Sequence, residues 1–206
     1  MLAKNFRDKI KNNMQKDLAT QLKFSEISFK RIALDKLEKI MLWRMSPEVS
    51  AYMYTDPKLT LDDQIRWFEK ITNDPKVSYW LIVVVGIDIG VLNLYDIDLH
   101  NKRCFWSYYI GEPWARGKGI ARHLECNIYD YVFFKIGMNK LCCEVLEVNE
   151  RVIQIHKKFG SEIEGIFKEH IFKNGRFLNV VRMAILKEKW TKIRSQYEYI
   201  PISIES

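Results

Sequence analysis

The segment 116–121, with the sequence RGKGIA, combines two glycines with two basic side chains and leads into a stretch of helical periodicity. Glycine permits a tight turn and leaves the first amides of the following helix unhindered. Such amides, together with the helix dipole, bind anions and a pyrophosphate in particular. The chain has no GxxxxGK[ST] loop, and no GxGxxG within a βαβ unit. The segment therefore predicts an anion site made of Arg116, Gly117, Lys118, Gly119, Ile120 and Ala121.

The elements that must position this segment follow from hydrophobic periodicity. Strands are predicted at 26–32, 79–85, 90–96, 103–110, 141–148, 161–170 and 176–186. Helices are predicted at 34–45, 47–52, from Thr60 onward, at 117–134 and at 149–159. Thr60 is a typical N-cap because acidic residues fill the turn that follows it. The order β-α-α-β-β-β-α-β-α-β-β predicts one mixed α/β domain, with RGKGIA between a strand and a helix.

In this order of elements, RGKGIA resembles motif A (R/Q-x-x-G-x-G/A) of the GNAT acetyltransferase superfamily. Residues 149–160, NERVIQIHKKFG, resemble its N-x-x-A-I-x-x-Y-x-K-x-G segment, and the likeness covers about residues 24–187. It implies a GNAT fold, with a mixed and mostly antiparallel sheet flanked by helices. It also implies an acetyl-CoA-dependent N-acetyltransferase. We accordingly expect a basic, helical extension at 1–24, a GNAT domain at 25–187 and a C-terminal extension at 188–206.

The resemblance also implies how acetyl-CoA is held. The amides of residues 117–121 hold the pyrophosphate, and the strand end at Ile110 pairs with the pantetheine arm. The arm then lies in a gap that opens toward the strand beginning at Leu141, and Asn149 contacts it. A strand amide polarises the acetyl carbonyl, which is electrostatic catalysis by a preorganised donor. No metal is implied.

Three residues are predicted to move protons or to orient the reacting groups. His156 stands where the family often has a tyrosine that protonates the leaving thiolate, and histidine can supply a proton as well. The alternative is that His156 only packs between helix and sheet. Glu144, acting through water, is the predicted base for the amine, and the alternative is a structural ion pair. Asn93 is predicted to orient a water or the amine.

The acceptor side is predicted from residues 43–54 (WRMSPEVSAYMY) and 60–68 (TLDDQIRWF). They resemble the acetyltransferases of the pseudaminic acid pathway, which acetylate the 4-amino group of UDP-4-amino-4,6-dideoxy-N-acetyl-β-L-altrosamine. The flat or polarisable side chains suit a nucleobase, while guanidinium and amide groups suit the diphosphate. The predicted acceptor residues are Arg44, Met53, Tyr54, Gln64 and Trp67.

Other interpretations of the acceptor side stay open. Met53 and Trp67 also fit as core residues of two helices. A ribosomal-protein N-terminal acetyltransferase of the RimJ/RimL type shares the W/F-x-x-x-P-x-V opening and needs a peptide groove. A function of another class is a non-catalytic acyl-CoA-binding or scaffold domain. Intact glycines at 117 and 119 disfavour that last interpretation.

Charge and cysteine usage limit the partners. The chain of 206 residues has 33 basic and 26 acidic side chains and a net charge of +7. Residues 1–24 carry +4 of it and residues 187–206 carry +1, which leaves +2 on residues 25–186 and disfavours a nucleic-acid partner. No apolar run is long enough to span a membrane. Four cysteines without metal-ligand spacing predict buried thiols in a cytoplasmic protein. A small-molecule amine is the expected partner, and a homodimer is compatible with the sequence.

Overall fold

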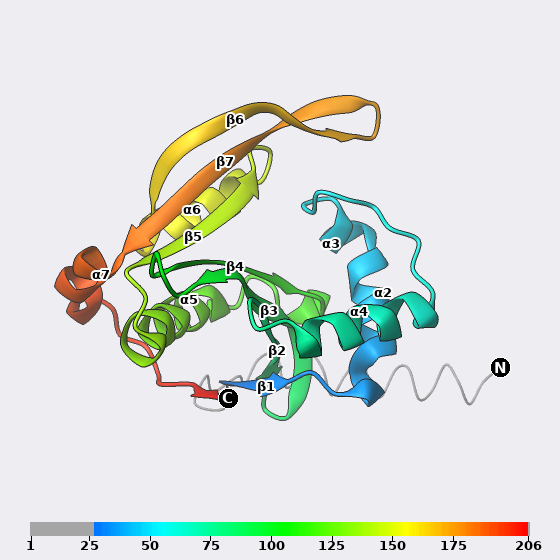
Figure 1. Ribbon diagram of the computed structural model, residues 1–206, viewed down its shortest axis with the longest axis horizontal. Helices are drawn as coiled ribbons and strands as arrows, with labels where there is room; N and C mark the ends of the chain where they lie inside the picture. The colour runs from blue at the N-terminus through cyan, green and yellow to red at the C-terminus, as the bar shows by residue number, and fades with distance from the viewer. Residues whose placement is uncertain (1–26, 206) are drawn as a thin grey trace.

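The computed structural model describes residues 27–205 of the chain (Figure 1). One mixed sheet forms the centre of the molecule. Its eight strands lie in the order β6-β7-β5-β4-β3-β2-β1-β8. Neighbours are antiparallel except for β4–β5 and β1–β8, which are parallel, so the predicted mixed, mostly antiparallel sheet is confirmed. The strands are β1 (Ile27–Arg31), β2 (Ser78–Val84), β3 (Ile87–Asp98), β4 (Arg103–Ile110), β5 (Lys140–Leu146), β6 (Glu162–Lys173), β7 (Arg176–Leu186) and β8 (Ser203–Ile204).

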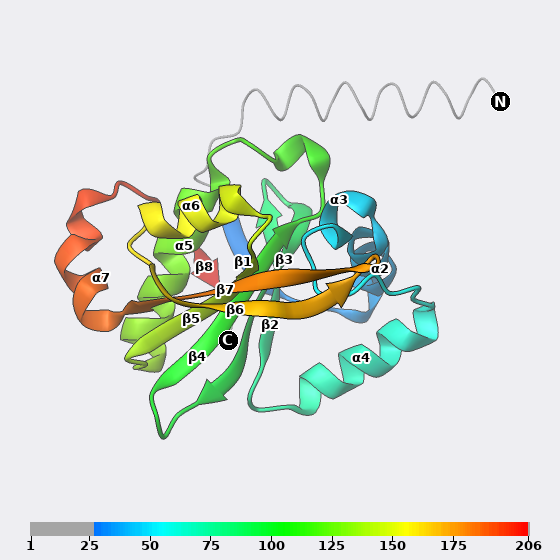
Figure 2. The same ribbon diagram turned by 90° about the horizontal axis from the view of Figure 1, so that it is seen from above.

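Helices cover both faces of the sheet, as Figure 2 shows from above. Side chains alternate across a strand, so in β2 Trp80 and Ile82 face one helical layer while Leu81 and Val83 face the other. The first layer contains α5 (Ile120–Asp130), α6 (Glu150–Lys158) and α7 (Lys187–Ile193). The second contains α2 (Leu37–Met45), α3 (Pro47–Ser50) and α4 (Leu61–Asn73). Short helical turns are η2 (Leu34–Lys36), η3 (Pro113–Ala115), η4 (Tyr131–Ile136) and η5 (Arg194–Gln196).

The predicted element order is confirmed, with one helix boundary corrected. The Thr60 hydroxyl accepts from the amide of Asp63, and the Asp63 side chain accepts from the amide of Thr60 in return, so α4 begins with a capping box. The helix predicted at 117–134 begins instead at Ile120. Gly117 (φ +74°) and Gly119 (φ +82°) occupy the left-handed region, which cannot be part of a right-handed helix.

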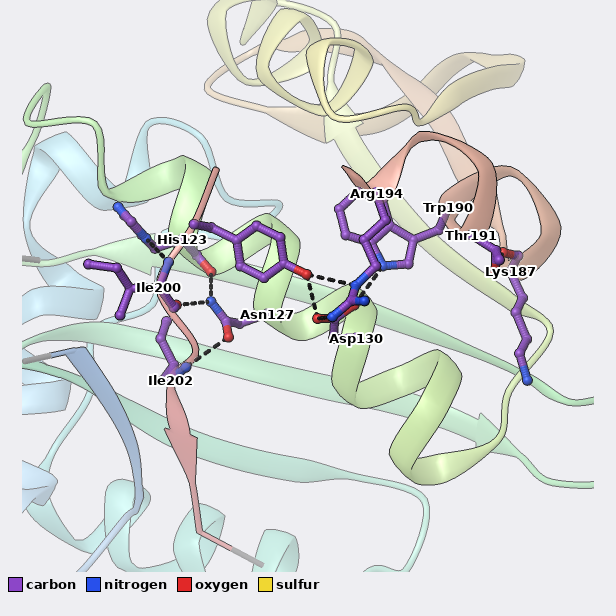
Figure 3. Close-up of polar contacts among 10 residues, drawn as sticks. His123, Asn127, Asp130, Lys187, Trp190, Thr191, Arg194, Ile200 and Ile202 are labelled. Atoms are coloured by element: carbon purple, nitrogen blue, oxygen red, sulfur yellow. Dashed lines mark hydrogen bonds and ion pairs between the residues drawn. The ribbon is translucent and has the colours of Figure 1, made fainter. Parts of the chain in front are cut away.

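The C-terminal segment packs against α5, where the sequence pattern predicted no elements (Figure 3). Trp190 of α7 is fully buried and its indole Nε1 donates to Asp130 Oδ1 at 2.9 Å. Arg194 and the Tyr199 hydroxyl also donate to the Asp130 carboxylate. Further along, Asn127 donates to the carbonyl of Ile200 and accepts from the amide of Ile202, and β8 then pairs with β1. The segment therefore completes the same sheet and core as the rest of the molecule.

The sequence also carried predictions about the cysteines, about membrane spans and about the N-terminal extension. The four cysteines are free and buried, as predicted. None of the helices within residues 27–205 is long and apolar enough to cross a membrane. The basic extension predicted at 1–24 lies outside the described residues.

The Asp130 carboxylate joins α5 to the C-terminal segment, so Asp130→Asn should destabilise the fold. The amide cannot accept from all the donors around it, and one lost hydrogen bond to a charged group costs about 1.5–3 kcal/mol. We expect urea denaturation to report a loss of that order in the free energy of unfolding. Glu188→Gln, which removes the exposed pair with Lys192, is the control and should change little. Equal stability of both variants would contradict this role of Asp130.

Candidate active site

Strands β4 and β5 separate shortly after they begin, which opens a gap in the sheet. They pair at only three positions, the last of which joins Phe105 to Cys142. Beyond it β4 continues beside β3, while β5 continues beside β7. The facing edges of residues 106–110 and 143–146 thus present backbone N–H and C=O groups without a strand partner. The predicted splay is confirmed, and an extended chain that carries amides can pair with such an edge.

The RGKGIA segment ends at the N-terminus of α5, close in the chain to the open end of β4. Gly119 is the N-cap, and the first amides of α5 have no partner inside the helix. The Ile120 side chain is buried, so this residue offers only its backbone amide. A Cβ added to Gly119 would meet nothing within 4 Å, so space for a ligand exists there. The helix dipole adds positive potential at this end of α5.

Basic side chains surround the RGKGIA segment, and one of them, Arg116, stabilises the fold by hydrogen bonds to the backbone. Arg116 donates from Nε to the carbonyl of Ile110 (3.0 Å) and from Nη2 to that of Gly111 (3.2 Å), so it ties the segment to the end of β4. Lys118 is exposed. Arg151, which the sequence analysis missed, places Nη2 3.7 Å from the position that a Gly117 Cβ would take. The sequence feature that could have identified Arg151 is its position in the segment NERVIQIHKKFG, two residues after Asn149.

Asn149 is the N-cap of α6, directly after the open part of β5. Its carbonyl accepts from the amide of Val152 at 3.0 Å, while its side chain makes no capping hydrogen bond. Asn149 therefore follows the open part of β5, and its side-chain amide is not used to cap α6. This position is compatible with the predicted contact to a chain in the gap.

A cavity of about 320 Å³ lies on the opposite face of the sheet, between α2, α4 and strands β3 and β4. It brings together five predicted residues: Arg44, Met53, Gln64, Trp67 and Asn93. The sequence analysis missed other wall residues, among them Tyr79, Ser107 and Tyr109. These three come from β2 and β4, and only the strand pairing places them beside the helices. The cavity is large enough for part of a small-molecule ligand.

Arg44 is the cation of this cavity and is only partly satisfied. Its Nη2 donates to the carbonyl and the hydroxyl of Thr55, at 3.0 and 2.8 Å. Its Nη1 is buried and has no hydrogen-bond partner within the described residues. Burial lowers the pKa of the guanidinium, against the opposing effect of Tyr109 and Asp56. A buried donor of this kind is stabilised when a ligand brings an acceptor.

The neutral walls of the cavity are aromatic and amide groups. Trp67 packs edge-on against Tyr79 with ring centroids 5.2 Å apart, so it serves both the apolar cluster under α2 and the cavity. Gln64 is buried, and Asn93 Oδ1 accepts from the Ser107 hydroxyl at 2.6 Å. Trp67 is therefore a packing residue, as the alternative interpretation held, and it also forms part of the cavity wall where a substrate contact was predicted.

Tyr54 and Glu144 meet outside this cavity, beside the β6–β7 hairpin. The Tyr54 hydroxyl donates to Glu144 Oε2 at 2.9 Å, and Arg182 Nη1 donates to Oε1 at 2.7 Å. Burial, together with Glu144, raises the pKa of Tyr54. The Arg182 guanidinium also stacks on Phe105. The ion pair that the sequence analysis weighed against a base role is present, and Tyr54 does not line the cavity.

Lys173, near the turn of the β6–β7 hairpin, binds the loop after α3. Its ammonium contacts the carbonyls of Ser50 (2.5 Å) and Met53 (2.7 Å) and Asp56 Oδ1 (2.9 Å). The side chain is buried, and it sets the position of the loop that supplies Met53 to the cavity. The sequence analysis missed Lys173, because a lysine beside a hairpin turn gives no signal of a tertiary contact.

His156 lies under the gap between β4 and β5. Its ring packs edge-on against Trp106 and Tyr108, and its Nδ1 is 2.8 Å from Glu125 Oε1. Burial alone would lower the pKa of His156, but the Glu125 carboxylate, together with Cys143, raises it well above its usual value. The sequence analysis missed Glu125. Among residues 27–205, no three His, Cys, Asp or Glu side chains lie close enough to hold a metal ion.

The comparisons with known proteins agree with this arrangement. The family model described as "Acetyltransferase (GNAT) domain" matches residues 27–162. Spermidine N(1)-acetyltransferase of Escherichia coli K12 is 26% identical over 142 residues, which are 69% of this chain and 76% of the relative. Acetyltransferase PseH of Campylobacter jejuni is 23% identical over 131 residues, 64% of this chain and 80% of the relative.

A solved structure shares the fold. The spermidine N-acetyltransferase from Vibrio cholerae, crystallised in complex with CoA and spermine, superimposes with a TM-score of 0.77 at 24% identity. The match covers 81% of this chain and 99% of that one. The chain therefore belongs to the GNAT family and is an acetyl-CoA-dependent N-acetyltransferase.

Proposed function

We propose that this enzyme transfers the acetyl group directly from acetyl-CoA to the primary amine of a small molecule bound in the 320 Å³ cavity. One observation carries the proposal: β4 borders both sites. Its residues Ser107 and Tyr109 line the cavity, and its free edge beyond Phe105 lines the gap. An amine in the cavity and a thioester in the gap are thereby held against the same strand, which removes most of the entropic cost of bringing them together.

The transfer requires charge stabilisation and two proton movements. As the amine nitrogen forms a bond to the carbonyl carbon, the carbonyl oxygen gains negative charge that free amides of β4 stabilise. The C–S bond then breaks, and the thiolate takes a proton for which His156 is the proposed donor. Glu144 with a water is the proposed acceptor of the amine proton. Asn93, held by Ser107, orients that water or the amine.

Two classes of acceptor amine are supported by different observations. The relatives named above include spermidine acetyltransferases, matched both in sequence and in fold, which supports a polyamine. The cavity itself supports an amine that carries an anionic group, such as a nucleotide-linked 4-amino sugar. A peptide acceptor is less well supported, because none of the relatives named above is a peptide acetyltransferase by name.

The charges in the cavity favour the anionic class. Its lining contains one cation, Arg44, and one carboxylate, Asp63. Asp63 already accepts from Thr60 and pairs with Arg66, whereas Arg44 Nη1 has no partner among the described residues. The second ammonium of a polyamine would thus face an unpaired guanidinium. A phosphate or carboxylate would instead satisfy it with a charge-assisted hydrogen bond.

A thiol-release assay tests the proposal. Acetyl-CoA is offered with spermidine, a UDP-linked 4-amino sugar, an aminoglycoside and an N-terminal peptide. Turnover with one of the small amines supports the function, and the preferred amine identifies the class. Turnover with the peptide alone overturns a small-molecule acceptor. Acetyl-CoA binding without turnover of any amine supports a non-catalytic acyl-CoA-binding domain instead.

Gly119→Asp should weaken acetyl-CoA binding by at least about 10-fold. It places a carboxylate beside the proposed pyrophosphate site, and repulsion at such a distance costs one to a few kcal/mol. Gly119→Asn is the matched control, since asparagine has the same shape and tolerates the left-handed backbone as aspartate does. Isothermal titration calorimetry measures both. An unchanged Kd in the aspartate variant would contradict the assignment of the loop.

Arg44→Met should raise the KM for the UDP-linked amino sugar by about 10–100-fold, the effect of losing a hydrogen bond between charged groups. The KM for spermidine should stay equal or fall, because a repulsive cation is removed. Lys70→Met, on the exposed part of α4, is the control for a general loss of positive charge. A rise in the KM for spermidine that matches the rise for the sugar would show that Arg44 only shapes the cavity.

A further inference from the structure

Glu125 is a fully buried carboxylate in the middle of α5, far from either end of the helix. A buried carboxylate is costly unless a cation or donors accompany it. Two groups do so here: the Tyr129 hydroxyl one turn later, which donates to Oε2, and His156 of α6. The Tyr129 hydroxyl oxygen also lies 3.1 Å from that of Ser161. Glu125 is therefore held in one position from two sides.

His156 connects this carboxylate to the gap between β4 and β5. The ring packs against Trp106 and Tyr108 of β4 and contacts the Cys143 thiol of β5. Trp106 and Cys143 are the first residues after the last paired position of the two strands. The imidazole thus lies where the strands begin to separate, at the closed end of the gap.

The groups around His156 leave Glu125 as its only carboxylate neighbour among the described residues. Glu125 faces it from α5, Tyr108 from β4 and Cys143 from β5. The His156 Nδ1 and Glu125 Oε1 atoms are 2.8 Å apart without the alignment of a good hydrogen bond, so their attraction is mainly electrostatic. A buried histidine alone would be neutral, whereas a carboxylate at this distance favours the imidazolium.

We propose that Glu125 is a positioning residue of the transfer reaction, which holds His156 as an imidazolium at the closed end of the gap and fixes Nε2 as its donating nitrogen. This rests on the proposed function. The attacking amine forms the C–N bond, the C–S bond breaks and its electron pair stays on sulfur. The thiolate takes the proton from Nε2, and the ring becomes neutral with its remaining proton on Nδ1 toward Glu125. The amine proton goes to water, which later returns a proton to Nε2.

The charge of His156 can be measured without turnover. Long-range ¹H–¹⁵N spectra of protein labelled with ¹⁵N-histidine distinguish an imidazolium from a neutral ring, and His156→Gln assigns the signal among the four histidines. We expect an imidazolium at pH 7.5 in the wild type and a neutral ring in Glu125→Gln. Tyr129→Phe is the matched control, because it removes the other partner of Glu125 and should leave His156 charged. A neutral ring in the wild type would overturn the proposal, and this result does not depend on the folding of Glu125→Gln.

The pH dependence of kcat tests the catalytic part. A raised pKa keeps His156 protonated until the pH rises through that value, and Glu125→Gln removes the carboxylate that contributes most to the rise, while Cys143 stays in place. The alkaline limb of the kcat profile should therefore move at least one pH unit lower in Glu125→Gln and stay in place in Tyr129→Phe. An unmoved limb in Glu125→Gln with an intact Tm would overturn the positioning role. Absence of turnover in the wild type with every amine would contradict the proposed function instead, and the spectra would still decide the charge.

Discussion

The separation of β4 from β5 after three paired positions is the constraint on which the rest of the site depends. A strand edge that leaves its ladder exposes backbone groups that the fold must cover, bind or solvate. Here the two strands remain anchored on their other sides, β4 to β3 and β5 to β7, so the gap persists without unfolding either of them. The C-terminal segment adds rigidity behind it, because it fixes α5, whose N-terminus faces the open end of β4.

The ion pairs around this gap follow one pattern. Glu125 with His156, Glu144 with Arg182, and Lys173 with Asp56 each join two elements that are distant in sequence. Only the first pair is buried on both sides, and breaking a buried pair is expensive although the pair contributes little net stability, so it fixes which elements meet. Arg44 differs from these residues in having no carboxylate within ion-pair distance in the described part of the chain, and its Nη1 is buried without a hydrogen-bond partner, as Arg182 Nε also is. The ion pairs hold the site together, whereas the unpaired Nη1 of Arg44 is the feature on which the proposed anionic acceptor rests.

Local chemistry explains which features the sequence predicted. Strand alternation, the cap at Thr60 and the order of elements depend on neighbouring residues, and all three are confirmed. The start of α5 was predicted three residues early, because helical periodicity continues through glycines whose φ angles are positive. Glu125 and Lys173 were missed for a different reason: their partners lie on elements that only the tertiary fold brings near. The short β8 was missed because two residues carry no periodicity.

The acceptor side shows why proteins at this level of sequence identity can share a fold and still differ in substrate. A TM-score of 0.77 at 24% identity means that backbone geometry is shared while most side chains differ. The donor side relies mainly on backbone: strand edges, glycines and helix amides, which tolerate substitution of their neighbours. The acceptor cavity relies on side chains such as Arg44, Gln64 and Trp67, which can change without changing the fold. The chemistry of the donor therefore transfers between relatives more securely than the identity of the amine.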